Sequence, residues 1–294
     1  MKDLKCLVTG ASGFLGRQVA SRLRQEYQLV LQGHQHASEG MLAIDLRDSD
    51  QLRKMLDNVQ PDIVVHGAAY RDPDFCEAYR EEVRRLNVCP TEVFTEILPD
   101  EVPFLFISSD YVFDGLHPPY QEDDVRNPVN ADGHSKMVSE DRVLQRARGI
   151  VLRVPLLIGA GLTWEGSGFI QKTVHVIQSK ERVEIDDRGI RFPVWIDDVA
   201  DVIAFLLKKS LPGVFHYSGL RGVTKYAWTK EIADRLGTSI EHVFPCYNES
   251  RTKAMRPLNT QPLTTKVQNL GYTPVYRLFR GRGTCSGYVF KDII

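Results

Sequence analysis

A glycine-rich turn stands between the first apolar segment of the chain and the helical pattern that follows. The apolar run is Lys5–Thr9, and the turn has the sequence GASGFLG, in which Gly10, Gly13 and Gly16 are three residues apart. In a strand–turn–helix unit, the first glycine permits the sharp turn, the second lets the backbone approach a pyrophosphate, and the third lets the helix pack closely on the strand. The free N–H groups at the helix N-terminus then face the phosphates. The pattern predicts a dinucleotide-binding unit.

Further strands and helices alternate at similar spacing. Strands are expected at Gln28–Gln32, Asp62–His66 and Phe104–Ser108, with a helix from about Asp48 to Asn58. Such alternation is typical of an α/β Rossmann fold with a doubly wound parallel sheet. Ligands of these sheets bind at the carboxyl ends of the strands.

The second half of the chain is less regular. Glycines at 159–161 and 166–168 mark loops before a helix through Ile170, Val174 and Ile177. Two more helices are expected, at Val199–Leu207 and at Tyr226–Leu236, the latter ended by a glycine. We therefore expect a dinucleotide-binding Rossmann domain at 1–155 and a smaller α/β lobe at 156–294. Part of 192–218 is expected to return to the Rossmann domain, and residues 276–285 receive no assignment.

Composition excludes several classes of partner. With 294 residues, 43% of them hydrophobic, the chain has enough apolar surface for a large core. A formal charge of −1 gives no reason to expect nucleic acid or a membrane surface, and Arg277, Arg280 and Arg282 are interpreted as a solvated tail. Five dispersed cysteines favour neither disulfides nor a metal site. Without a signal peptide pattern or a long apolar run, a cytoplasmic location is expected.

The end of the second strand bears on the type of cofactor. Enzymes that prefer NAD usually carry an acidic residue there, whereas the segment 32–36 reads QGHQH and has none. Arg17 or a protonated His34 is available for a 2′-phosphate. NADP(H) is therefore favoured over NAD(H), with Arg17 as an ordinary surface residue in the alternative.

Several longer motifs resemble one branch of the extended short-chain dehydrogenases/reductases, which contains dTDP-4-dehydrorhamnose reductase and the beta subunit of methionine adenosyltransferase. The most specific motif is the run SSDYVFDG at 108–115. The other matching segments are Thr9–Gly16, Asp45–Asp48, His66–Ala69, Leu86–Val88, Pro118–Asp123, Arg191–Ala200, Phe215–Gly219 and Arg256–Pro257.

The resemblance implies that 1–155 is an NADP(H)-binding Rossmann domain and that the lobe at 156–294 binds the substrate, and it implies roles for individual residues. The cofactor would be held by Gly10, Ser12, Gly13, Phe14, Leu15, Gly16, Arg17, Asp45, Leu46, Ala68, Ala69, Tyr70, Asn87, Ser108, Lys136 and Pro155. The catalytic positions would be Asn87, Ser109, residue 132 and Lys136, with Ser109 bonding the substrate carbonyl. The nucleotide-linked sugar would meet Ser109, Asp110, Tyr111, Val112, Arg191, Trp195 and Arg256. The alternatives are a helix brace for Asn87, a strand-end contact for Ser109, core packing for Tyr111 and Trp195, and a structural carboxylate pair for Arg256.

The chain departs from the family pattern at one catalytic position. The family pair is Tyr-x-x-x-Lys, and here Asp132 stands four residues before Lys136. An aspartate, with a reference pKa of about 3.9, is normally ionised at neutral pH and has no proton to give, and a nearby lysine lowers its pKa further. The alternatives are an exposed i,i+4 ion pair with Lys136, a carboxyl group kept neutral by burial, or proton donation by Tyr70, Tyr111 or His134. A further alternative is that Asp132 was deliberately introduced in place of the natural residue, in which case the ordinary reductase reaction is expected of the natural protein.

Two functions follow as competing hypotheses. In the first, the protein is an NADP(H)-dependent reductase of a nucleotide-linked 4-keto-6-deoxysugar. In the second, it is a silent NADP-binding regulatory subunit that acts on a partner enzyme, like the methionine adenosyltransferase beta subunit. The retained Lys136 suits both, the missing tyrosine favours the second, and the motif around Ser109 favours the first. A homodimer is also compatible with the sequence.

Overall fold

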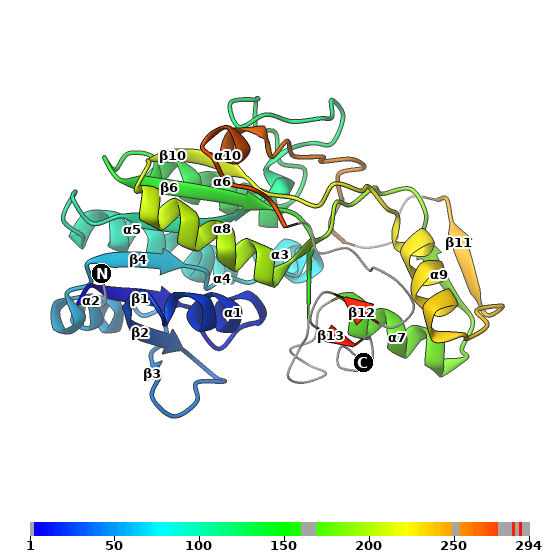
Figure 1. The fold of residues 1–294 in the computed structure, drawn as a ribbon, viewed down its shortest axis with the longest axis horizontal. Coiled ribbons are helices and arrows are strands. Elements are labelled where there is room, and N and C mark those ends of the chain that lie inside the picture. The colour runs from blue at the N-terminus through cyan, green and yellow to red at the C-terminus, as the bar shows by residue number, and fades with distance from the viewer. Residues whose placement is uncertain (1–2, 160–168, 249–252, 276–283, 286–287, 290–294) are drawn as a thin grey trace.

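Seven parallel strands form the centre of the structure, a computed structural model that describes residues 3–159, 169–248, 253–275, 284–285 and 288–289 (Figure 1). The predicted α/β Rossmann fold is confirmed. From one edge to the other, the strands are β10 (Gly213–His216), β6 (Gly149–Val154), β5 (Phe104–Ser109), β4 (Ile63–His66), β1 (Lys5–Thr9), β2 (Gln28–Gly33) and β3 (Leu42–Ala43). The strands predicted from the sequence lie within one residue of these bounds, whereas β3, β6 and β10 were not predicted.

The strand order reverses at β1, which lies between β2 and β4. From β1 the chain builds outward through β2 and β3, and then returns to the other side for β4, β5 and β6. Thr9 and His66 are paired at the carboxyl ends of β1 and β4, so the loops that follow them begin side by side. This is the switch point at which doubly wound sheets bind ligands.

Helices cover both faces of the sheet, because alternate residues of each strand point to opposite sides. In β1, Cys6 and Val8 join a core cluster under α1 (Phe14–Leu23) and α8 (Ile196–Lys209), while Leu7 joins the cluster of the opposite face. That second face is covered by α2 (Ser49–Val59), α5 (Cys89–Ile97) and α6 (Ala131–Val143). Helix α8 therefore ties a late segment of the chain to the N-terminal sheet.

Helix ends follow local side-chain chemistry. Asp48 caps α2 by accepting hydrogen bonds from the N–H groups of Asp50 and Gln51. Asn130 caps α6 in the same way through the N–H of Gly133. Gly237 adopts φ +63° and ends α9 (Lys225–Leu236), as the glycine at this position predicted.

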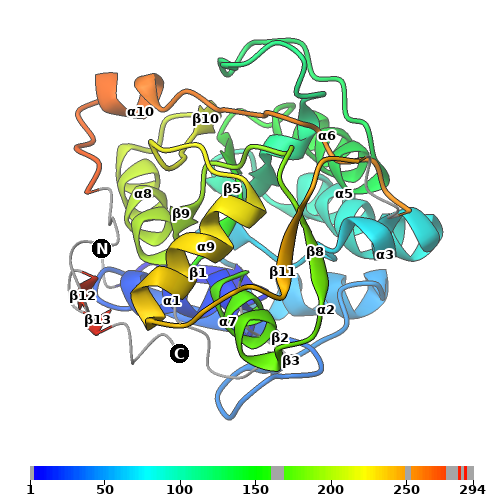
Figure 2. The same ribbon diagram turned by 90° about the vertical axis from the view of Figure 1, so that its right-hand side faces the viewer.

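A smaller lobe lies beyond the carboxyl ends of the strands (Figure 1). Figure 2 looks onto this lobe, in which α7 (Phe169–Ser179) packs on α9 and β8 (Val183–Asp186) pairs with β11 (Val243–Cys246). Its core contains Ile170, Val174 and Ile177, the periodic residues of the predicted helix. Strand β9 (Val194–Trp195) pairs with β7 (Leu157–Ile158) and leads directly into α8.

Some sequence expectations fall outside the described residues. These are most of the glycine loops at 159–168 and the arginines at 277, 280 and 282. No helix in the described part of the chain is both long and apolar enough to cross a membrane.

Candidate active site

The glycine turn has the shape that a pyrophosphate requires. Gly10 adopts φ +66°, and a Cβ there would lie 2.9 Å from the backbone of Ala68. A Cβ on Gly16 would lie 2.1 Å from the carbonyl oxygen of Gly10. Gly13 is exposed and caps α1 without a side-chain hydrogen bond, and the first turn of that helix carries no acidic residue. The N–H groups of Gly10, Ala11 and Gly13 already donate to Gln32 and Gly10, whereas those of the first turn of α1 have no partner inside the helix and fit a dinucleotide phosphate.

Two arginines bring positive charge to this turn. Arg17 donates to the carbonyl oxygen of Ser12 at 2.7 Å, and the Arg71 guanidinium lies 6.0 Å from the centre of the Phe14 ring. Burial and the charge of Arg71 lower the pKa of Arg17, and burial lowers that of Arg71. Two like charges held near one turn favour an anionic ligand between them.

The predicted adenine side contains a closed ion pair. Asp45 receives three hydrogen bonds from the Arg47 guanidinium, at 2.7, 2.9 and 3.1 Å, which lower the pKa of its carboxyl group. His34 lies 3.7 Å from the same carboxylate. Leu46 is 3% exposed and packs in the core between the sheet and α2. The carboxylate nearest the end of β2 is therefore already neutralised by a cation.

Asn87 connects the cofactor loop to the catalytic helix. It lies in η1 (Arg84–Val88), a π-helical turn, and its side chain bonds both the N–H of Tyr70 at 2.8 Å and the carbonyl oxygen of Tyr70 at 3.0 Å. Its amide also donates to the hydroxyl of Ser135 at 3.1 Å, and Ser139 donates to its backbone carbonyl at 2.7 Å. Asn87 thus braces the loop of Ala68, Ala69 and Tyr70 against α6, as the helix-brace alternative supposed.

The two serines at the end of β5 face different surroundings. Ser108 is 3% exposed and donates to Glu140 at 2.5 Å. Ser109 is half-buried and begins η2 (Asp110–Val112), where its Oγ accepts the N–H of Tyr111 at 3.1 Å. The alternation of the strand therefore sends Ser108 into the interior and leaves Ser109 at the carboxyl end of the sheet.

The sequence analysis missed the charged group that lies behind Ser108. Glu140 is fully buried, and its two oxygens accept hydrogen bonds from Arg153 at 2.9 and 2.7 Å. Arg126 also contacts Glu140, at 3.1 Å. An arginine inside the apolar run of β6 was the available signal, because a buried cation needs a carboxylate partner.

Lys136 is buried at the same end of β5. Its Nζ donates to the carbonyl oxygen of Ile107 at 3.0 Å and lies 5.0 Å from the centre of the Phe106 ring. Burial lowers the pKa of this amine, with Asp132 acting in the opposite direction. Within the described residues no other protein acceptor takes an Nζ hydrogen bond, so two of its three N–H groups remain for a ligand.

Asp132 is buried, and the expectation of an exposed ion pair is wrong. Its side chain is 6% exposed, no carboxylate–ammonium contact with Lys136 within 4 Å exists in the described chain, and its Oδ1 has no hydrogen-bond partner there. Burial raises the pKa of this carboxyl group, against the smaller lowering effect of Lys136. The expected net lowering is therefore also wrong, because desolvation outweighs the lysine charge. His134 is exposed, as expected.

The residues predicted to contact the substrate do not all face one surface. Tyr111 is half-buried, and the Arg191 guanidinium lies 5.7 Å from the centre of its ring. Arg256 pairs with Asp74 at 2.8 Å, which is the structural alternative for this arginine. Trp195 is 3% exposed in the core of the lobe, which is also its structural alternative. Val112 is fully buried, and Pro155 is buried directly after β6.

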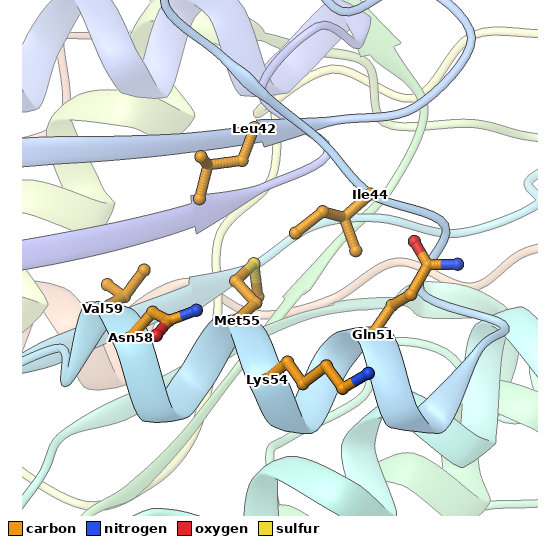
Figure 3. A pocket seen from close by; sticks show the side chains of 7 residues that line it. All are labelled: Leu42, Ile44, Gln51, Lys54, Met55, Asn58 and Val59. Atoms are coloured by element: carbon orange, nitrogen blue, oxygen red, sulfur yellow. The ribbon is translucent and has the colours of Figure 1, made fainter.

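A separate apolar hollow lies between β3, the edge strand of the sheet, and α2 (Figure 3). Leu42, Ile44 and Met55 point into it, with Gln51 and Lys54 at its side. None of the predicted site residues lines it.

Comparisons with known proteins agree with this fold and identify the family. The model of the RmlD substrate binding domain family matches residues 4–280. The methionine adenosyltransferase 2 subunit beta of Danio rerio is 35% identical over 275 residues, which are 91% of this chain and 85% of that protein. A probable low-salt glycan biosynthesis reductase of Haloferax volcanii is 30% identical over 78% of this chain and 79% of its own length. Among solved structures, dTDP-4-dehydrorhamnose reductase from Bacillus anthracis in complex with NADP superposes with a TM-score of 0.82 at 23% identity, covering 93% and 95% of the two chains.

Proposed function

The chain belongs to the RmlD substrate binding domain family, and on that premise we propose that it binds NADP(H) and reduces the keto group of a nucleotide-linked 4-keto-6-deoxysugar. The observation that carries the proposal is the buried Lys136 amine. It is fixed to the carbonyl of Ile107, two residues before Ser109, and keeps unused donors. A lysine with this arrangement suits the hydroxyls of a nicotinamide ribose, while the Ser109 hydroxyl suits a substrate carbonyl.

NADP(H) is preferred over NAD(H) on electrostatic grounds. Arg17 and Arg71 concentrate positive charge at the turn, and β2 ends at Gly33 without a carboxylate for ribose hydroxyls. Asp45 is engaged by Arg47. A 2′-phosphate would gain from the arginines and meet no unpaired carboxylate on this side, so the preference is a matter of charge. The dTDP-4-dehydrorhamnose reductase structure from Bacillus anthracis carries NADP, which supports this choice, whereas the dTDP-glucose 4,6-dehydratase structure from the same organism, at 16% identity, carries NAD.

Residue 132 makes the proposed reductase slow at neutral pH. When bound, the cofactor supplies a hydride, and the protein must supply a proton to the substrate oxygen. A tyrosine beside a lysine does this well, because its lowered pKa lies close to the working pH. Asp132 has no hydrogen bond to Ser109 in the described structure, so it does not take over the task by direct contact.

The test is NADPH oxidation with dTDP-4-dehydrorhamnose, comparing the natural chain with Asp132→Tyr at pH 8. We expect the substitution to raise turnover by about 10²-fold, the lower range of general acid catalysis. Asp141→Tyr, on the exposed part of the same helix, is the matched control and should leave turnover unchanged. If both chains bind NADPH and neither turns over at pH 8 or at pH 5.5, the reductase proposal fails.

A second function is favoured by the same residue. The identity of 35% to methionine adenosyltransferase 2 subunit beta exceeds that to the reductase structures, and a site without its tyrosine suits a binding subunit. In this reading the chain holds NADP(H) and regulates a methionine adenosyltransferase catalytic chain. Co-purification with that enzyme, without any reductase turnover, would favour this function.

A further inference from the structure

We propose that Asp110, acting through the hydroxyl of Ser109, delivers the proton that the absent tyrosine would otherwise provide. The inference rests on the proposed reductase function and assigns a general acid that the family pattern does not supply. It starts from the contacts of Ser109. The Oγ accepts the N–H of Tyr111 at 3.1 Å, and its own O–H donates to Oδ1 of Asp110 at 3.3 Å.

Asp110 is a buried carboxyl group next to a more accessible hydroxyl. Its side chain belongs to a residue that is 3% exposed, whereas Ser109 is only half-buried. Its second oxygen, Oδ2, accepts a short hydrogen bond from the Thr260 hydroxyl, which is itself buried. The carboxyl group is therefore held between the end of β5 and a segment near the C-terminus, and Ser109 is its hydrogen-bonded route outward.

The charge around Asp110 suits a proton donor. Among the described residues, the Asp110 carboxyl group has no ion pair within 4 Å. The charged or titratable groups that interact electrostatically with it are Arg191 and Tyr111. Burial raises the pKa of the carboxyl group to about 6, despite the lowering effects of Thr260 and Arg191. Close to neutral pH a useful fraction of Asp110 therefore carries a proton, unlike an ordinary aspartate with a pKa of about 3.9.

The proton transfer balances in one concerted movement. With Asp110 protonated, its O–H donates to Oγ of Ser109, and the serine O–H turns to the substrate carbonyl. As the carbonyl carbon receives the hydride, the C=O electron pair moves to oxygen, which takes the serine proton while Ser109 takes that of Asp110. The ketone becomes an alcohol, the reduced nicotinamide dinucleotide is oxidised, and Asp110 is left as a carboxylate that solvent reprotonates.

Other candidate donors are less well placed. The Tyr70 hydroxyl lies 3.3 Å from Arg47 and 3.4 Å from Glu82, and His134 is exposed. Burial raises the pKa of the Tyr111 hydroxyl, which makes it a weaker acid than a free tyrosine. Asp132 is buried and makes no hydrogen bond to Ser109. In the described structure Asp110 provides the one carboxyl group bonded to the Ser109 hydroxyl.

The pH dependence of turnover tests the relay. Turnover of the natural chain should be highest below about pH 6 and fall as the pH rises, because only protonated Asp110 can donate. Asp110→Asn keeps the size of the side chain and removes the acid, and should lower turnover by at least about 10²-fold while NADPH still binds. Asp114→Asn, on the same segment and bonded to Tyr120, is the matched control and should retain the natural profile.

Thr260→Val gives an independent test that a merely structural role would not satisfy. Removing the hydroxyl that stabilises the ionised carboxyl raises the pKa of Asp110, so the falling limb should move to higher pH. In cofactor-free protein, the infrared spectrum of the natural chain should contain a protonated-carboxyl band that disappears through about pH 6 and is missing in Asp110→Asn. Bands of Asp132 and Glu122, whose pKa values burial also raises, should remain in both spectra and cancel in their difference. The proposal is overturned if the falling limb of the pH profile does not move in Thr260→Val. It is also overturned if the infrared spectra of the natural chain and of Asp110→Asn are identical.

Two failures can be told apart. If the natural chain reduces the sugar nucleotide and Asp110→Asn does so equally well, the reductase function stands and the relay is wrong. If the natural chain binds NADPH but shows no turnover even at pH 5.5, both proposals fail, whatever the infrared spectra show.

Discussion

Asp132 bears on both the stability of the fold and the proposed reaction. A carboxylate that is 6% exposed, with one oxygen lacking a hydrogen bond within the described structure, costs free energy that the native fold must offset elsewhere. Such a residue persists when the fold tolerates the cost or when a ligand completes its hydrogen bonds. The sequence shows that Asp132 stands four residues before Lys136, but it does not show that Asp132 is buried.

The stability of the chain should depend on pH through Asp132. Burial raises the pKa of the carboxyl group in the folded state, so the folded state binds the proton more tightly than the unfolded state. The contribution of this group to stability is complete below the unfolded pKa of about 3.9 and is lost as the pH rises through the folded value. Asp132→Asn, which does not titrate, should therefore gain stability relative to the natural chain as the pH rises from 4 to 8.

Urea unfolding at several pH values checks this prediction. Asp141→Asn, on the exposed side of the same helix, provides the control, because its side chain is 51% exposed. A free-energy difference between Asp132→Asn and the natural chain that stays constant over this pH range would show that Asp132 is not strained by burial.

At the scale of elements, three segments meet around one buried charge. Glu140 of α6 joins Arg153 of β6 and Ser108 of β5, and the two charged residues are 0% and 2% exposed. The contact fixes α6, and with it Lys136, against the end of β5. Sequence periodicity predicted β5, yet it could not pair a glutamate with an arginine thirteen residues away, because that pairing depends on how a helix packs on the sheet.

Removing the carboxylate should destabilise the whole sheet. Glu140→Gln leaves Arg153 as a buried cation with a weaker partner, and we expect the free energy of unfolding to fall by about 3–5 kcal/mol. Glu96→Gln breaks an exposed pair with Arg53 and should cost less than about 1 kcal/mol. Denaturant titration measures both, and equal small losses would mean that the buried pair contributes no more than a surface one.

At the scale of the molecule, the sequence was most informative where the physics is local. The glycine turn, the order of strands and helices and the end of α9 at Gly237 depend on backbone conformation and apolar period, so they could be predicted. The placement of Trp195 in the lobe core and of Arg256 beside Asp74 depends on segments far apart in the chain. Such long-range contacts also decide whether a side chain lines a binding site or packs in the interior.

Binding of NADP(H) at the glycine turn underlies both proposed functions, and fluorescence titration of the natural chain with NADPH and with NADH measures it. We predict saturable binding of NADPH, weaker binding of NADH, and loss of NADPH binding in Gly16→Val, whose Cβ would meet the Gly10 carbonyl oxygen. Circular dichroism of the variant would show that its sheet is retained. If the natural chain shows no saturable binding of NADPH, the glycine turn does not hold this cofactor and both proposed functions are contradicted.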